Sequence, residues 1–201
     1  MNCRQQAAME TRRKLLKTGK MLICQNGLAN ISVEDITRAA GVSKGTFYTY
    51  FKRKEDILFE LSRDTFGEIL EAAMAFNGNF MEKLTCYMVR FSECIENDSV
   101  HMAQDWVSHV VMPVPPQSGY DRGKLPFDRD SAAELLHYGV ACGMLKPDFP
   151  VDTMAHTLVD ILYGQMLCWA MSDGAYSLRE RTREFCELYL KALFKEDEVN
   201  E

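Results

Sequence analysis

The 201-residue chain lacks any apolar stretch long enough to cross a bilayer. Its longest nearly apolar run, residues 161–171, is interrupted by Gly164 and Gln165, whereas a membrane-spanning helix needs about 20 apolar residues. The first ten residues, MNCRQQAAME, also lack the apolar core of a signal peptide. We therefore expect a cytoplasmic protein that has no membrane partner.

The sequence has no C-x-x-C pair, and its cysteines, seven in all, are odd in number. These two facts argue against a disulfide framework and against a cysteine-rich zinc site. We expect free thiols that are mostly buried, because free cysteine packs like a small apolar side chain. A switch that works by cysteine oxidation stays open as an alternative.

Several enzyme signatures are missing as well: the P-loop, the H-E-x-x-H motif and the dinucleotide fingerprint. One pattern looks catalytic, because His101, Asp105 and His109 are spaced by four and share a helix face. Two imidazoles and a carboxylate suit zinc or nickel. We expect no metal, no cofactor and no catalytic residue. A metal-switched regulator and a helical metal-dependent enzyme remain as alternatives.

The net charge of −6 conceals a division of the chain. Residues 1–60 contain 11 basic and 6 acidic side chains, which gives +5 and leaves −11 for the remainder. A basic head on an acidic body indicates a module that binds a polyanion. An acidic body repels DNA, so we expect any DNA contact to lie in the head.

Helical periodicity dominates the sequence, and no segment shows the alternation of a β-strand. We therefore predict an all-α fold. Prolines at 113, 115, 116 and 126 bracket a polar stretch that cannot be helical throughout. The expected helices are residues 9–25, a short helix after Ser32, another from Ser43 through Phe51, and longer helices near 54–76, 80–96, 99–112, 128–143, 151–172 and 177–195.

The two short helices carry local start and stop signals. Ser32 and Asp35 have the spacing of a capping box. Gly41 ends the first short helix, and Ser43 can cap the second. A short helix, a turn with glycine and a second short helix form the helix-turn-helix layout, in which the second helix enters the major groove.

The string ISVEDITRAAGVSKGTFYTYFKRKEDIL resembles the DNA-binding domain of the TetR family of transcriptional regulators. The shared pattern A-G-V-S-x-G-x-x-Y-x-Y/H-F occupies residues 40–51, and the following K-E is Lys54-Glu55. The resemblance implies a three-helix DNA-binding domain at residues 1–53. It also implies a helical ligand-binding and dimerisation domain at residues 54–201. Gly19 departs from the alanines common in the family at this position, which costs roughly 1 kcal/mol in a helix interior unless it permits a close helix contact.

The start of the second short helix carries side chains that can reach DNA. Phe47 and Phe51 are four residues apart and are expected to face the core. The resemblance places Thr46, Tyr48 and Thr49 near base edges. It also implies that Lys44, Tyr50, Lys54 and Ser32 contact phosphates of the DNA backbone. Alternatives are packing for the tyrosines and plain solvation for the lysines. The predicted DNA-binding set is Ser32, Ser43, Lys44, Gly45, Thr46, Tyr48, Thr49, Tyr50 and Lys54.

The acidic body would supply the regulatory input. The resemblance implies a small-molecule pocket among its helices and a homodimer formed through the last two of them. Aromatic and methionine side chains are plentiful there, and the candidates for the pocket lining are Trp106, His109, Tyr138 and Tyr163. We predict a homodimeric repressor that leaves its double-stranded DNA operator when a small apolar or aromatic effector binds.

Overall fold

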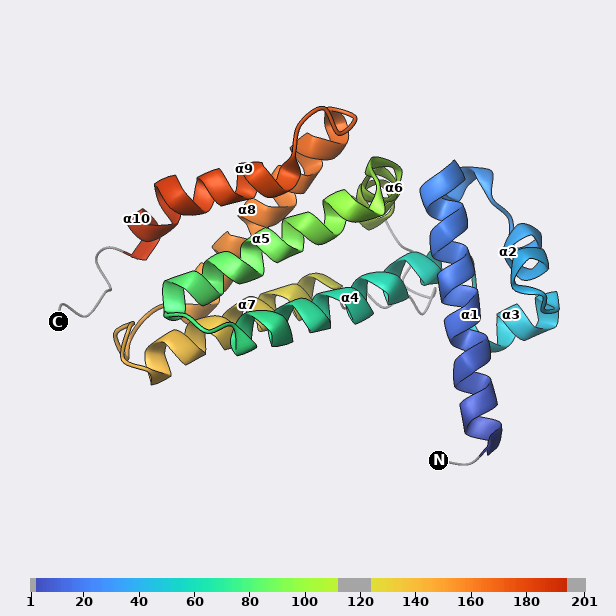
Figure 1. Ribbon diagram of the computed structural model, residues 1–201, viewed down its shortest axis with the longest axis horizontal. Coiled ribbons are helices and arrows are strands. Elements are labelled where there is room, and N and C mark those ends of the chain that lie inside the picture. The colour runs from blue at the N-terminus through green and yellow to red at the C-terminus, as the bar shows by residue number, and fades with distance from the viewer. Residues whose placement is uncertain (1–2, 112–123, 195–201) are drawn as a thin grey trace. The chain divides into compact units, whose positions relative to one another are not determined.

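The computed structural model of the chain describes residues 3–111 and 124–194 (Figure 1). Over these ranges it contains helices and no β-strand, which confirms the all-α prediction. None of the described helices is long and apolar enough to span a membrane. The helices are α1 (Cys3–Asn26), η1 (Leu28–Asn30), α2 (Val33–Ala40), α3 (Lys44–Tyr50), α4 (Glu55–Ala75), α5 (Phe80–Asp98), α6 (Val100–Val111), α7 (Lys124–Ala141), α8 (Val151–Met171), α9 (Leu178–Phe185), η3 (Cys186–Leu190) and α10 (Lys191–Phe194).

Two helices begin earlier than periodicity predicts. Helix α1 begins at Cys3 instead of residue 9, in a segment of good helix formers that has no apolar face to reveal it. Helix α7 begins at Lys124 instead of residue 128 and includes Pro126 in its first turn. Proline is tolerated there because the first-turn N–H groups have no intrahelical acceptor. Most of the predicted proline-rich loop lies outside the described residues.

The chain packs as two compact units. The first unit holds α1, η1, α2, α3, the part of α4 up to Asp64, and α6. The second holds the rest of α4 from Thr65, together with α5, α7, α8, α9, η3 and α10. Packing thus divides the chain inside α4, not at residues 53 and 54. The predicted functional boundary at that point stays a prediction.

The core of the second unit forms where α5 packs against α7, α8 and α9 and where α7 packs against α8 (Figure 1). Large fully buried side chains of this core include Tyr87, Phe80, Phe91 and Phe194. Lys83 secures the end of α4, since its Nζ donates to the carbonyl oxygens of Met74 and Phe76 at 2.5 Å each.

The cysteines are less buried than expected. Of the six whose side chains the structure describes, Cys186 alone is buried, whereas Cys142 and Cys168 are exposed. Burial raises the pKa of the Cys186 thiol to about 11. The expectation of mostly buried thiols is therefore wrong: Cys168 lies on an exposed side of α8, and Cys142 lies in the turn after α7.

Candidate DNA-binding site

The start of α2 is a complete capping box. Ser32 Oγ accepts the N–H of Asp35 at 3.1 Å, and Asp35 Oδ2 accepts the N–H of Ser32 at 3.0 Å. Hydrogen bonds from Ser32 also lower the pKa of the Asp35 carboxyl. The predicted cap is confirmed. The Ser32 hydroxyl is already engaged in this box, so a phosphate contact there would be an additional one.

The turn between α2 and α3 depends on Gly41. This residue has φ 63° and ψ 40°, the left-handed conformation that side chains disfavour. Its N–H donates to Arg38 and Thr37 and so closes α2. Ser43 then caps α3 by accepting the N–H of Thr46 at 3.0 Å. The two short helices and their turn are therefore confirmed.

One face of α3 belongs to the core of the first unit. Phe47 is fully buried and Phe51 nearly so, with their ring centroids 5.4 Å apart. This confirms the prediction that both rings face inward.

The opposite face of α3 is open to solvent. Lys44, Gly45, Tyr48 and Thr49 are exposed and share one side of the helix, and the Tyr48 side chain is 56 % exposed. Packing in the core is therefore not the role of Tyr48. Ser43 is also exposed, whereas Thr46 and Tyr50 are half-buried beside this face. The structure thus gathers the predicted residues 43–46 and 48–50 on one short helix and its cap.

Lys44 has a partner within the protein. Its ammonium forms an ion pair with Glu34, which α2 places beside α3, and both side chains are about half exposed. An exposed pair of this kind contributes roughly 0–1 kcal/mol. Exchanging the carboxylate for a DNA phosphate would therefore cost little.

Lys54 lies apart from α3 and has a structural role that the sequence did not reveal. Its Nζ donates to the carbonyl oxygens of Leu28 at 2.7 Å and Ile31 at 2.8 Å. Asp105, on α6, accepts the N–H of Leu28. Together they fix η1, which connects α1 to α2. These partners are 26 and 77 residues from Leu28, so no local pattern could have shown them.

Gly19 permits the close contact that its position in α1 requires. A Cβ at this residue would lie 2.7 Å from Cδ1 and 2.8 Å from Cγ2 of Ile57, which is fully buried on α4. Glycine therefore brings α1 close to the start of α4, and this offsets its low helix propensity.

The sequence Gly41-Val42-Ser43-Lys44-Gly45 also fits the G-x-S-x-G pattern of a nucleophile elbow. The surrounding structure does not suit that role. An elbow joins a strand to a helix, whereas this serine lies between two helices and caps the second. The pattern is here part of the helix-turn-helix.

The His101, Asp105 and His109 stripe does not form a metal centre in the part of the molecule that is described. The Asp105 carboxylate is bonded to the N–H of Leu28, His101 is exposed, and the side chain of His109 lies outside the described residues. No group of three or more potential metal ligands occurs among the described side chains.

Known proteins resemble both parts of this chain. Residues 15–61 match the family model described as bacterial regulatory proteins, tetR family. The HTH-type transcriptional regulator AcrR of Shigella flexneri is 25 % identical over 92 % of this chain and 90 % of its own. The repressor KstR2 of Mycolicibacterium smegmatis is 27 % identical over 89 % and 88 %.

Residues 15–61 are a DNA-binding domain of the TetR family of transcriptional regulators, and regulators similar to this chain match about nine-tenths of it. The whole fold of the chain is that of the family: Thermus thermophilus FadR, solved in complex with lauroyl-CoA, matches 94 % of this chain and 96 % of its own with a TM-score of 0.73 at 23 % identity. The chain is a DNA-binding transcriptional regulator.

The predicted lining of the TetR-family ligand pocket is distributed over both units. Trp106 is buried in the first unit, whereas Tyr138 and Tyr163 are partly buried in the second. The side chain of His109 is outside the described residues. Tyr163 donates its hydroxyl to the buried Asp128 at 2.6 Å. The pocket assignment stays a prediction.

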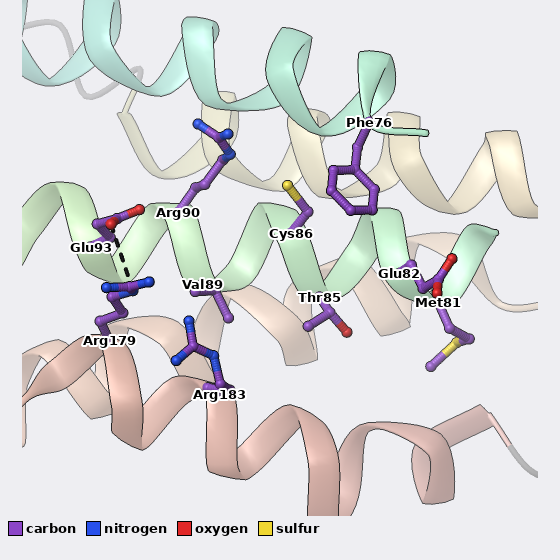
Figure 2. A pocket seen from close by; sticks show the side chains of 10 residues that line it. All are labelled: Phe76, Met81, Glu82, Thr85, Cys86, Val89, Arg90, Glu93, Arg179 and Arg183. Carbon is purple, nitrogen blue, oxygen red and sulfur yellow. Dashed lines mark ion pairs between the residues drawn. The ribbon is translucent and has the colours of Figure 1, made fainter. Parts of the chain in front are cut away.

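A groove of about 500 Å³ lies between α5 and α9 in the second unit (Figure 2). Arg179 and Arg183 project into it from α9, and glutamates already pair with both: Glu93 lies 3.6 Å from Arg179, and Glu180 lies 2.7 Å from Arg183. None of the predicted pocket residues lines it. The groove is lined by Phe76, Met81, Glu82, Thr85, Cys86, Val89, Arg90, Glu93, Arg179 and Arg183.

Proposed function

We propose that this protein is a homodimeric repressor that binds a palindromic operator and leaves it when a small effector binds. The observation that carries the proposal is the outward face of α3. Exposed Lys44, Gly45, Tyr48 and Thr49 lie on one side of a helix whose other side is anchored by Phe47 and Phe51. A rigid helix with exposed polar and basic side chains at its start suits entry into a major groove.

Dimerisation is supported by an unpartnered apolar face in the second unit. Leu167 and Met171 on α8 are 40 % and 78 % exposed, and Leu188 and Tyr189 on η3 are 69 % and 58 % exposed. Large exposed apolar side chains on two elements of one unit are typical of a subunit interface. Two copies would pair these helices as a symmetric four-helix bundle.

The π-helical turn η3 contributes to this face. Residues 186–190 interrupt the α-helical register between α9 and α10. Cys186 and Leu190 remain buried, while Leu188 and Tyr189 point outward. Since π-turns are often found at functional sites, this one supports the assignment of the dimer interface to η3.

A ligand-responsive mechanism agrees with the relatives. FadR was solved with lauroyl-CoA, and KstR2 is described as a ketosteroid regulator. For this chain we propose an effector with an apolar or aromatic body, because the core of the second unit is rich in aromatic rings. We also propose a cytoplasmic location, where the operator is found.

Selection of genomic fragments by the purified protein at about 0.15 M salt tests the proposal. We expect enrichment of a palindrome whose half-sites are about one helical turn apart or slightly more. The same selection after unfolding, washing and refolding removes any co-purified effector. No enriched sequence in either selection would contradict the proposal.

A further inference from the structure

The core of the second unit contains a charged pair. Lys124 and Asp128 lie one turn apart on α7, and their side chains are only 6 % and 0 % exposed. The Lys124 ammonium donates to both oxygens of the Asp128 carboxylate. Tyr163 on α8 donates its hydroxyl to the same carboxylate at 2.6 Å. Helices α7 and α8 thus supply the charged pair and its hydroxyl donor, and the pair is removed from water.

Stability alone does not account for this pair. The desolvation of two charges offsets much of their attraction, and well-packed apolar side chains often serve a core as well or better. Burial lowers the pKa of Lys124 to about 8, although Asp128 acts in the opposite direction. At neutral pH the ammonium therefore keeps its charge at an unfavourable position. Such groups are concentrated at functional sites.

Aromatic rings face the ammonium. Lys124 Nζ lies 3.6 Å from the ring centroid of Phe66 and 5.4 Å from that of Phe91. The ring centroids of Tyr163 and Tyr87 lie 6.3 and 6.4 Å from that of Phe91. A carboxylate together with aromatic faces is the arrangement by which proteins recognise amines and quaternary ammonium groups.

The two members of the pair differ in how firmly they are held. Asp128 lies inside α7, is fully buried and is fixed by Tyr163. Lys124 bears its charge on a flexible four-carbon stem. The ammonium can therefore leave more easily than the carboxylate.

We propose that Asp128, Phe66 and Phe91 form a binding site for an organic cation, which Lys124 occupies when no ligand is present. The ligand is an amine or quaternary ammonium compound with an apolar or aromatic body. Its positive group replaces the Lys124 ammonium on the Asp128 carboxylate and against the two rings. Its body lies among the remaining aromatic side chains. The inference rests on the proposed function, because this cation is the effector that releases the repressor.

The test compares three probes that share one body: 4-phenylbutylamine, 4-phenylbutanol and 4-phenylbutyrate. Titration calorimetry measures their affinity for the wild-type protein and for Lys124→Met and Asp128→Asn. We expect wild-type protein to bind the amine at least about tenfold more tightly than the alcohol or the carboxylate. Asp128→Asn loses this preference. Lys124→Met binds the amine about tenfold more tightly than wild type, because the competing ammonium is gone.

Tighter amine binding by Lys124→Met would show that the Lys124 ammonium occupies the site of the ligand and is displaced by it. A lysine that only stabilises the core would not compete with the amine. Should Lys124→Met fail to fold alone, Lys124→Gln and the neutral double variant Lys124→Met/Asp128→Asn replace it. The double variant is expected to fold and to show no amine preference. Unchanged or weaker amine binding by the lysine variants would overturn the proposal. Preference for phenylbutyrate would also overturn it, by identifying Lys124 as an anion site.

Binding of the selected DNA fragments by the same proteins separates this inference from the proposed function. Wild-type protein that binds specific DNA but shows no amine preference overturns the cation site and leaves the repressor intact. Protein that binds amine tightly but no specific DNA contradicts the proposed function. Release of the DNA by 4-phenylbutylamine, and not by 4-phenylbutanol at equal concentration, supports both.

Discussion

The first unit presents its charged and polar side chains on the open face of α3, whereas the second unit encloses a lysine and an aspartate among aromatic rings. Each unit also has a lysine whose Nζ donates hydrogen bonds to two main-chain carbonyl oxygens. This lysine is Lys54 in the first unit and Lys83 in the second. These two lysines provide hydrogen bonds to backbone carbonyl oxygens, and a buried carbonyl oxygen without a hydrogen bond would destabilise the fold. Lys124 instead donates to the Asp128 carboxylate and faces the rings of Phe66 and Phe91.

This comparison shows that lysine has different roles in the two units. A lysine that bonds carbonyls secures the fold, and an exposed lysine such as Lys44 can exchange a weak partner for phosphate. In the proposed cation site, the Lys124 ammonium holds the position against Asp128 and two rings that an organic cation would take. In the proposed function, the first unit contacts DNA, and the second unit forms the dimer and recognises the ligand.

The largest effect is expected from charging the apolar face of the second unit. Leu188→Glu would bury a carboxylate in the dimer interface and give a monomer. Operator affinity should fall at least about hundredfold, because the two half-sites no longer share one protein. Light scattering and a DNA-binding titration measure both effects. Met144→Glu is the matched control, since Met144 is an exposed methionine that belongs to neither α8 nor η3. A Leu188→Glu protein that stays dimeric would show that the exposed apolar face around Leu188 is not the dimer interface.

Lys54→Met should next affect the stability of the first unit. The carbonyl oxygens of Leu28 and Ile31 lose a charged donor, which costs about 1–3 kcal/mol of unfolding free energy. Urea unfolding measures this loss. The salt dependence of DNA binding should stay unchanged if Lys54 serves only the fold. A slope reduced by about one, with unchanged stability, would instead support the phosphate contact predicted for it.

Gly19→Ala is expected to have a smaller effect on the same unit. The added methyl group meets Ile57 at less than 3 Å, and overpacking of this kind costs about 1–3 kcal/mol. Better helix propensity returns about 1 kcal/mol, so we expect a net loss near 1 kcal/mol. Chemical unfolding of Gly19→Ala, Ile57→Val and the double variant checks the contact. Strictly additive effects would show that these two residues are not coupled.

Lys44→Ala should change stability least. Loss of its exposed pair with Glu34 costs roughly 0–1 kcal/mol. DNA affinity should fall on all sequences, and the salt slope should decrease by about one. Lys17→Ala, an exposed lysine on α1, is the control. Equal salt slopes for wild type and Lys44→Ala would remove Lys44 from the DNA interface.

The features that the sequence predicts well are those set by neighbouring residues. The caps at Ser32 and Ser43 and the turn at Gly41 depend on residues within a few positions, so spacing alone identifies them. The buried rings of Phe47 and Phe51 follow from helix periodicity. These local signals also carry the resemblance to the TetR family.

The features that could not be predicted depend on distant partners. Lysine and aspartate four residues apart usually form a solvated pair, and the sequence does not show that α8 brings Tyr163 to Asp128. The roles of Lys54 and Asp105 depend in the same way on η1. Tertiary packing, and not the local sequence pattern, determines which charged side chains are buried.

The most direct test of the account is to compare the DNA sequences selected by wild-type protein and by Tyr48→Ala. Tyr48 is the most exposed aromatic side chain on α3 and contributes little to the core of the first unit. We predict that both proteins select the same palindrome with the same half-site spacing, and that base preference changes at one position in each half-site. An identical motif bound with identical affinity would contradict the claim that this face of α3 reads DNA.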